Sequence, residues 1–394
     1  GELSASLVTR DAIERAKAVN PKLNAITVEN FDLAQTNSEK PFSGFFQGVP
    51  TFIKDTDEVP GLPLYLGSRS LPGEPSDKYS KAAKQIIDTG LNCLGTTTTP
   101  EFGLTGTTES LRFGATCNPW NTAYSTGGSS GGSSALVAAG VIPIAHANDG
   151  AGSIRIPASC CGLVGLKASR GRIKDKEVPG YLPANILHDG VVTRSVRDTW
   201  AFHAEIEKNI PAKEFPPIGD MSESFPKNLK IAALTENCLG EDSSAELVQA
   251  THDVARLCES LGHEVEMISN PFYEKFDEDF WLLWAHFGFL IRYSVGKELS
   301  SKFDHTQLEQ WPKYLISRHW RNIHKVPVAF WRLRGFVSQY ETFMQKFDIL
   351  LTPTLGTTVP KLGFFGPEVS GQEHWERINA VSYTHLTLPT STHG

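Results

Sequence analysis

Hydrophobic positions along the chain follow two periods, which together predict a mixture of helices and strands. Between residues 5 and 18, apolar side chains recur at the spacing of an amphipathic helix, at Leu7, Ala12, Ile13 and Ala16. The stretch GVPTFIKDTDEVPG (48–61) is instead a short apolar run between glycine and proline residues, which is typical of a buried strand. We therefore expect helices and strands to alternate from the start of the chain.

The same alternation continues through most of the chain and predicts an α/β fold class. Residues 80–97 have the pattern of a helix, a glycine stop and a strand, and residues 133–149 that of a small-residue helix and a buried strand. Residues 229–268 repeat a strand–helix–strand unit. The run FDILLTPT (347–354) predicts a last strand that stops at proline.

The stretch from about 265 to 345 differs from the rest, because it holds five of the eight tryptophans. One interpretation is a helical layer that covers the sheet with its large side chains. The other is a variable wall of a substrate pocket, since pockets are commonly lined by aromatic residues. The pattern alone leaves both interpretations open.

Composition and charge narrow the class of protein. Of 394 residues, 40% are hydrophobic and 21% are charged, as in globular proteins, and the net charge is −7. This acidic balance offers no basic face for nucleic acid. No run approaches the roughly 18 apolar residues of a membrane span, and the first residues have no signal-peptide pattern. We expect neither nucleic acid nor membrane as a partner, and we leave a homodimer open.

The six cysteines predict neither a metal site nor a disulfide framework. Cys160 and Cys161 are adjacent rather than in CxxC spacing, and no histidine cluster is near them in the sequence. We expect small buried thiols. Reduced thiols are typical of the cytoplasm, so we expect a cytoplasmic protein.

The loop YSTGGSSGGSSALVAAGV (124–141) has four alternative interpretations: a linker, a phosphate loop, a nucleophile elbow or a catalytic serine loop. A flexible linker would not run directly into a closely packed small-residue helix. A phosphate loop needs a lysine after its glycines, and none is present. Residues 127–131 fit the elbow G-x-S-x-G, but a turn-rich segment precedes them where the elbow needs a buried strand.

Two further segments favour serine chemistry. The stretch HANDGAGSIRIPASCCGLVGLKASRGR (146–172) follows a predicted buried strand, and its small residues allow several backbone N–H groups to converge, as an oxyanion hole requires. Lys54 ends the apolar strand GVPTFIK. A lysine there either extends to solvent at the sheet edge or is buried and able to act as a base.

These segments together resemble the successive blocks of the amidase signature family. The similarity covers GVPTFIKD, PEFGLTGTTES, NPWNTAYSTGGSSGGSS, the 146–172 stretch and GVVTRSVRD (190–198), and spans the chain from residue 3 to about 380. The resemblance implies one domain with a mixed central β-sheet sandwiched by helices. It also implies hydrolysis of a small-molecule amide by a Ser–cis-Ser–Lys triad, without metal or cofactor.

Carried over block by block, the resemblance implies a role for each matching residue. Ser153 matches the nucleophile, Ser129 the bridging serine that follows a cis peptide bond, and Lys54 the general base. The implied oxyanion donors are the backbone amides of Gly150, Ala151, Gly152 and Ser153. Ser130 and Arg155 match the positions that hold the two loops together.

Within the family, the nucleophile block is most similar to that of the 6-aminohexanoate-cyclic-dimer hydrolases, because Ala151 replaces the usual glycine and Cys160-Cys161 follows. A general small-amide or aryl-acylamide amidase is the alternative substrate class. A truncated relative without catalytic activity is a third alternative, although all three triad residues are present.

The resemblance also sets the expected boundaries. We expect a single domain over residues 1–380, with a catalytic core at about 45–200 and a chain truncated at both ends relative to the family. The last residues, VSYTHLTLPTSTHG (381–394), resemble a translated sequencing adapter, so we expect a non-native tail there.

Overall fold

The first helix shows how the sequence pattern becomes structure. The computed structural model describes residues 3–173, 179–212, 215–219, 221, 226–236, 240–272 and 275–381. Helix α1 (Ala5–Leu23) begins after Ser4, whose hydroxyl accepts a hydrogen bond from the Leu7 amide at 3.2 Å. It buries Ala12, Ile13 and Ala16, so the predicted amphipathic helix is confirmed.

The first sheet has the strand order β1-β3-β2 and is mixed. Strands β2 (Pro50–Lys54) and β3 (Asn92–Thr97) are parallel and are connected through helix α3 (Lys81–Ile87), whereas β1 (Ile26–Glu29) is antiparallel to β3. Every residue of β2 and β3 is buried, which fits their mostly apolar or small residues, and the buried polar exceptions are Lys54 and Asn92 at the strand ends.

A second sheet lies beside the first and brings two strand ends together. Its order is β8-β10-β9, with β10 (His188–Thr193) antiparallel to both β8 (Ile144–Asp149) and β9 (Val164–Gly165). Strand β2 is adjacent to β8, where the Thr51 hydroxyl donates to the Ile144 carbonyl at 3.0 Å. The carboxyl-terminal ends of β2 and β8 therefore lie close together.

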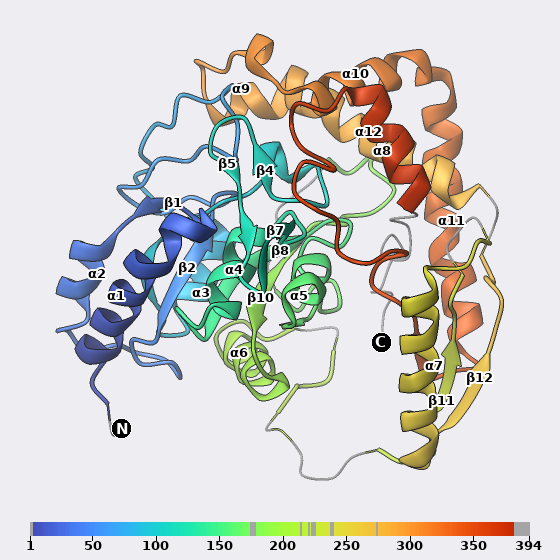
Figure 1. Cartoon of the computed structure of the whole chain (residues 1–394), viewed down its shortest axis with the longest axis horizontal. Helices are drawn as coiled ribbons and strands as arrows, with labels where there is room; N and C mark the ends of the chain where they lie inside the picture. The colour runs from blue at the N-terminus through green and yellow to red at the C-terminus, as the bar shows by residue number, and fades with distance from the viewer. Residues whose placement is uncertain are drawn as a thin grey trace.

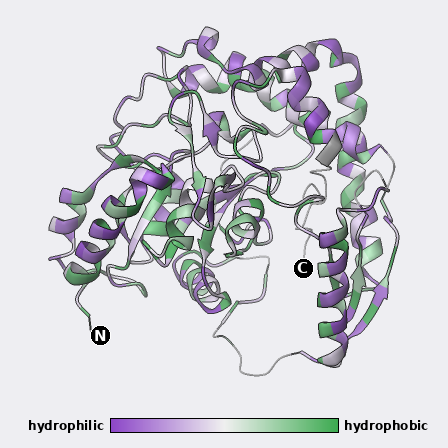
Figure 2. Ribbon diagram, viewed as in Figure 1, coloured by the Kyte–Doolittle hydropathy of each residue, from purple (hydrophilic) through white to green (hydrophobic). Residues whose placement is uncertain are grey.

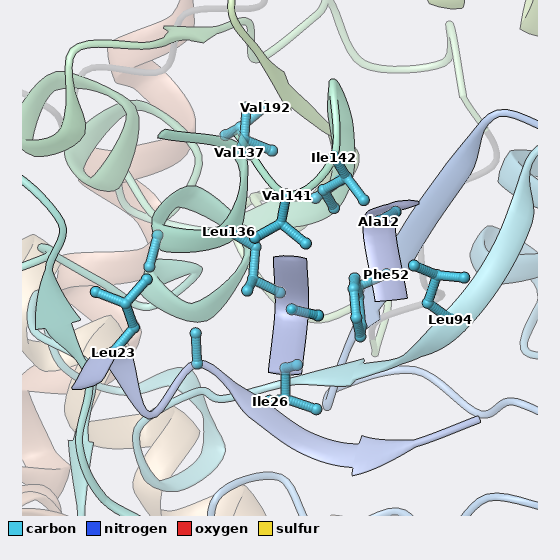
Figure 3. Close-up of a cluster of buried hydrophobic side chains, with 14 of the residues drawn as sticks. Ala12, Leu23, Ile26, Phe52, Leu94, Leu136, Val137, Val141, Ile142 and Val192 are labelled. Atoms are coloured by element: carbon cyan, nitrogen blue, oxygen red, sulfur yellow. The ribbon is translucent and has the colours of Figure 1, made fainter. Parts of the chain in front are cut away.

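A core of small and branched side chains holds these sheets against the helices. Helix α4 (Gly131–Ala138) contributes Leu136, which clusters with Phe52 of β2, Leu94 of β3 and Ala12 of α1 (Figure 3). All four are at least 95% buried, so this cluster fixes the position of α4 relative to β2 and β8.

A third, parallel sheet has the order β12-β11-β13. Strands β11 (Lys230–Ala233) and β12 (Glu264–Met267) are joined by helix α7 (Ala245–Ser260), and β13 (Ile349–Leu351) pairs with β11. Figure 1 shows this unit on the opposite side of the molecule from α1, and Figure 2 shows hydrophilic and hydrophobic residues alternating along α7. The predicted strand–helix–strand unit is confirmed.

The aromatic stretch forms a helical layer above the sheets (Figure 1). It comprises α8 (Phe276–Leu290), a π-helical turn (Ile291–Val295), α9 (Gly296–Leu299), α10 (Gln310–Arg321) and α11 (Val326–Met344), and α12 (Gly371–Val381) packs against α10. Trp281, Trp284 and Trp311 are buried in this layer. The helical-layer interpretation is confirmed; the layer also lines a cavity, and its role as the wall of a substrate pocket stays a prediction.

Shorter elements complete the described chain: α2 (Phe31–Asn37), β4 (Glu109–Ser110), β5 (Gly114–Ala115), β6 (Cys117–Asn118), β7 (Asn121–Ser125), α5 (Arg155–Cys161) and α6 (Val196–Asn209). Cys93, Cys160 and Cys161 are buried and free, as expected. Cys117 and Cys258 are free but only partly buried, and Cys238 lies outside the described residues. The expected non-native tail also lies outside them from residue 382 onward. Across the described ranges, no helix is long and apolar enough to cross a membrane.

Candidate active site

Three segments that are far apart in the sequence meet where β2 and β8 end. Lys54 is the last residue of β2, Ser129 lies in the loop before α4, and Ser153 lies in the loop after β8. Their exposed fractions are 0%, 2% and 8%, and the two serines line the same cavity. The structure therefore brings the three predicted triad residues into one buried region.

Three side-chain oxygens surround the Nζ atom of Lys54. Lys54 Nζ lies 2.7 Å from Ser129 Oγ, 2.9 Å from Ser130 Oγ and 2.6 Å from Asn148 Oδ1. Full burial excludes the solvent-extended lysine that the sequence left open. Removal from water penalises the charged form of an amine, and a neutral amine is what a general base needs.

The serine loop has the backbone that the resemblance implied. The Gly128–Ser129 peptide bond is cis, as expected. A Cβ atom on Gly128 would lie 2.5 Å from the Thr107 carbonyl oxygen, so only glycine fits beside this backbone. The Thr108 hydroxyl donates to the Gly127 carbonyl at 3.0 Å and accepts from the Gly131 amide at 3.0 Å. Thr108 thus fixes both ends of the loop that carries Ser129.

Ser130 and Asn148 connect the serine loop to β8. The Ser130 hydroxyl donates to the Asn148 carbonyl and accepts from the Asn148 amide, both at 3.3 Å. The Asn148 side chain donates to Thr56 Oγ1 at 2.6 Å, which directs its oxygen toward Lys54. Asn148 was not predicted from the sequence. Its only signal was a polar residue at the end of a buried apolar strand.

Asp149 organises the loop that carries Ser153. Arg155 donates to both of its carboxylate oxygens, at 2.9 and 3.0 Å, and Lys167 donates to Oδ1 at 3.2 Å. Burial by itself would raise the pKa of Asp149, but the charges of Arg155 and Lys167 and the hydrogen bonds hold this pKa well below its usual value. Asp149 is therefore an ionised anchor for the loop.

The structure leaves three of the four predicted oxyanion donors free. The Gly152 amide, predicted as one of these donors, donates to Asp149 Oδ1 at 2.7 Å and is thus already engaged. Within the described residues, the amides of Gly150, Ala151 and Ser153 have no hydrogen-bond acceptor. The carboxylate of Asp149 thus fixes one amide of the turn and leaves its neighbours available.

The Ser153 hydroxyl has no hydrogen-bond partner in the part of the chain that the structure describes. The bridging role that the resemblance implies for Ser129 predicts a direct hydrogen bond to Ser153, and the described residues lack one. Catalytic hydrogen bonds are often long in the free enzyme and shorten when substrate binds. Ser129 and Ser153 line one cavity, which leaves room for that adjustment.

Two cavities of different character meet at Ser153. The larger, of about 410 Å³, extends from Ser129 and Ser153 to the π-helical turn and α9. The smaller, of about 50 Å³, is lined by Phe280, Trp281, Trp284 and Phe365. Trp284 and Ser153 belong to both linings, so the serine lies between a large cavity and an aromatic one.

A buried cluster of Asp57, His146 and Asp189 has the residue types of a metal site. His146 Nδ1 accepts the Lys54 backbone amide at 3.2 Å, so a neutral ring carries its proton on Nε2. That nitrogen lies 3.2 Å from Asp189 Oδ1 and 4.0 Å from Asp57 Oδ2. Both ring nitrogens are thus engaged in positioning β2 against β8 and β10, and the cluster fits a structural role better than a metal.

Comparison with known proteins identifies the family. A family model described as Amidase matches residues 7–394. The chain belongs to the amidase family. This membership confirms the predicted resemblance and the predicted α/β fold, and it makes the protein an amide-hydrolysing enzyme.

Individual amidases are similar over most of the chain. A protein named "Putative amidase AmiC" from Mycobacterium tuberculosis is 42% identical over 370 residues, covering 93% of this chain and 78% of that protein. The 6-aminohexanoate-cyclic-dimer hydrolase of Paenarthrobacter ureafaciens is 39% identical over 282 residues, which cover 67% of this chain and 56% of that protein. A solved structure of 6-aminohexanoate cyclic dimer hydrolase complexed with substrate has a TM-score of 0.85 at 29% identity. The match covers 99% of this chain and 85% of that one.

Proposed function

We propose that this amidase cleaves carboxylic amides through an acyl-enzyme on Ser153, with Ser129 as proton relay and Lys54 as general base. The observation that carries the proposal is the 2.7 Å contact between Lys54 Nζ and Ser129 Oγ in a fully buried position. Ser129 lines the same cavity as Ser153, whose hydroxyl has no hydrogen-bond partner among the described residues. A nucleophile needs an adjacent base, and this buried amine is suitably placed.

Hydrogen-bond directions around Lys54 favour proton transfer from Ser129. A neutral amine donates two protons and accepts one at its lone pair. Asn148 Oδ1 can only accept, and the Ser130 proton is directed to the Asn148 carbonyl. Lys54 Nζ donates to Ser129 Oγ in the free enzyme; once the amine is neutral, the Ser129 hydroxyl is the one of these three contacts that can donate to its lone pair. Once it does so, its oxygen can take the proton of Ser153.

The reaction then proceeds in two balanced halves. Ser153 Oγ attacks the amide carbon while its proton passes through Ser129 to Lys54, and the amides of Gly150, Ala151 and Ser153 donate to the oxyanion. The intermediate collapses, the proton returns along the same route to the leaving nitrogen, and the amine departs. Water then cleaves the Ser153 ester by the same relay and releases the carboxylic acid.

For the substrate we propose 6-aminohexanoate cyclic dimer or a related oligomer. The proposal is supported by the 39% identity to the Paenarthrobacter hydrolase, by the TM-score of 0.85, and by a cavity large enough for such a molecule at about 410 Å³.

A general small-amide or aryl-acylamide amidase is the second candidate. Phe102, Trp284 and Phe287 in the wall of the larger cavity favour it, because flat apolar rings pack well against aromatic side chains. Fold and triad do not determine the substrate of an amidase, so the side-chain lining has to discriminate.

A hydrolysis panel followed by mass spectrometry tests both candidates. It contains cyclic and linear 6-aminohexanoate oligomers, anilides and simple primary amides, each incubated with wild type and with Ser153→Ala. We expect cleavage of the oligomers by wild type and none by the variant. Cleavage of anilides alone would support the second candidate. Equal cleavage by both proteins would contradict the role of Ser153.

A further inference from the structure

Acidic side chains line the large cavity at Ser153. Among the residues that the structure describes, its lining includes four carboxyl residues, Asp57, Glu58, Asp189 and Glu298, and no lysine, arginine or histidine. The buried amine of Lys54 lies behind Ser129 and Asn148 and is not part of this surface. Asp57 and Asp189 are buried beside His146, so Glu58 and Glu298 are the acids of the described lining that a substrate can meet.

Two of these acids come from separate elements and have no basic partner. Glu58 lies in the loop after β2, and Glu298 lies on α9. Glu58 Oε1 accepts a hydrogen bond from Ser76 at 3.0 Å, and Glu298 Oε1 accepts one from Ser294. Within the described ranges neither forms an ion pair, unlike Glu74, which pairs with Lys302. Both carboxylates are therefore available to a positively charged group that enters the cavity.

The rest of the lining is largely aliphatic. It includes the side chains of Leu64, Leu66, Leu290, Ile291, Val295 and Leu299. An alkyl chain gains from contact with such a surface, whereas an uncompensated charge in contact with it loses hydration. Aliphatic walls combined with unpaired carboxylates suit a chain of methylene groups that carries a positive charge.

The Ser153 hydroxyl supplies an independent indication that a ligand binds here. It is 8% exposed, lines this cavity and has no hydrogen-bond partner among the described residues. The oxygen is open to the cavity and can contact a substrate there. Its free hydroxyl marks where the reacting carbonyl lies, at one point of the same acidic, aliphatic cavity.

We propose that the preferred substrates of this enzyme are amides with an aliphatic arm that carries an ammonium group, which Glu58 and Glu298 bind. This specificity rests on the proposed function at Ser153. Among the proposed oligomers it favours linear ones with a free ammonium end over the uncharged cyclic dimer, and it disfavours amides whose arm ends in a carboxylate.

Three matched amides test the specificity. They share the scissile bond and differ only at the end of an alkyl arm, which carries an ammonium, a hydroxyl or a carboxylate group, and each set is made with the arm on the acyl side and on the amine side. We expect kcat/KM to be about three- to tenfold higher for the ammonium than for the hydroxyl compound, and lowest for the carboxylate. Added salt should reduce the preference.

A double variant and a charge-matched control assign the effect to the cavity. Glu58→Gln with Glu298→Gln should bring the ammonium-to-hydroxyl ratio close to one. Glu278→Gln removes a carboxylate that pairs with Lys325 and does not line the cavity, so it should leave the ratio as in wild type. Equal rates for the ammonium and hydroxyl amides in wild type, or an unchanged ratio in the double variant, would overturn the inference.

A binding measurement separates this inference from the proposed function. Calorimetry with Ser153→Ala compares the affinities for the ammonium and hydroxyl amides in the absence of turnover. Tighter binding of the ammonium compound without hydrolysis by wild type would contradict the catalytic proposal and leave the acidic specificity standing. Hydrolysis by wild type with equal binding of both amides would support the catalytic proposal and contradict the acidic specificity.

Discussion

At the scale of single residues, the two serines of the site have different surroundings, and these surroundings assign their proposed roles. Ser129 Oγ contacts a buried amine at 2.7 Å, whereas the Ser153 hydroxyl has no partner among the described residues and lies next to free backbone amides. A relay must exchange protons with a base, and a nucleophile must face the carbonyl and its oxyanion donors. The assignment makes the two serines experimentally distinguishable.

The first prediction concerns the nucleophile. Ser153→Ala should lower turnover at least about 10³-fold and abolish covalent labelling by a fluorophosphonate, because the attacking oxygen is removed. Ser134→Ala is the control, because Ser134 is buried on α4 without a side-chain hydrogen bond. This variant should still be labelled at Ser153. Labelling that survives in Ser153→Ala and disappears in Ser129→Ala would transfer the nucleophile to the elbow-like loop.

The second prediction concerns the base. Lys54→Ala should lose at least about 10³-fold in kcat, and Lys54→Arg should not recover it, because a guanidinium stays charged and cannot accept the Ser129 proton. Melting temperatures measured alongside kcat separate lost chemistry from lost folding. A folded Lys54→Arg enzyme with nearly normal kcat would show that Lys54 has only a structural role.

The sequence indicated some of these residues and not others. Lys54 was a candidate because a charged residue ended an apolar strand, and the glycine-rich loops marked where backbone amides converge. Asn148 and the engagement of Gly152 with Asp149 were not predictable, since both depend on how two distant loops fold against each other. Side-chain hydrogen bonds across 94 residues of chain, as from Lys54 to Asn148, leave no periodic signal.

At the scale of elements, close packing explains the small residues at the start of α4. A Cβ atom on Gly132 would lie 2.5 Å from Thr98 Oγ1 and 2.7 Å from the Ala25 carbonyl oxygen. The helix therefore lies directly against Ala25, just before β1, and Thr98, just after β3. Larger residues would displace the loop that carries Ser129 from the end of β2.

The third prediction uses two helical glycines with opposite surroundings. Gly132→Ala should lower the free energy of unfolding by about 1–3 kcal/mol, because the added methyl group overpacks a rigid contact. Gly335→Ala on α11 meets nothing within 4 Å and should stabilise the protein by up to about 1 kcal/mol through helix propensity. Chemical denaturation measures both. Equal effects of the two substitutions would contradict the packing explanation.

The positions of most elements could be predicted, but their grouping could not. Apolar periodicity located α1, β2, α3, β3, α4, β8, α7 and β13, because each has a buried face of regular spacing. The π-helical turn at Ile291–Val295 was not predicted, since its residues continue the helical pattern on both sides. The distribution of strands over separate sheets depends on long-range pairing that local patterns do not encode.

At the scale of the whole molecule, a buried pair of carboxyl groups connects the site to the helical layer. Glu101 Oε2 accepts from the Glu309 backbone amide at 2.7 Å, at the start of α10, and Glu309 Oε1 accepts from the Leu111 amide at 2.6 Å. Glu101 begins the short turn whose Gly103 and Leu104 line both cavities. The pair thus fixes α10 relative to the wall of the proposed active site.

Ionisation of this pair is opposed by burial. Removal from water raises the pKa of Glu101 to about 7, against a hydrogen bond from Ser68. Burial and the charge of Glu101 raise the pKa of Glu309 to about 8, although the Leu111 amide and the charge of Arg69 favour ionisation. Both folded-state values exceed the value of 4.5 that the free side chain has.

The last prediction follows from the sign of these shifts. Between about pH 4.5 and pH 8 the folded protein binds more protons at this pair than the unfolded chain does, so stability falls as the pH rises through this range. The urea midpoint of wild type should therefore be lower at about pH 8.5 than at about pH 6, and Glu309→Gln, which keeps the acceptor for Leu111 and cannot ionise, should reduce this fall. Some of the fall should remain, because burial also raises the pKa of Asp55 to about 7. Glu278→Gln, an acid whose pKa is lowered by its hydrogen bond from Lys325, is the control and should behave as wild type in this range. An identical fall in wild type and in Glu309→Gln would show that ionisation of Glu309 does not contribute to the loss of stability in this pH range.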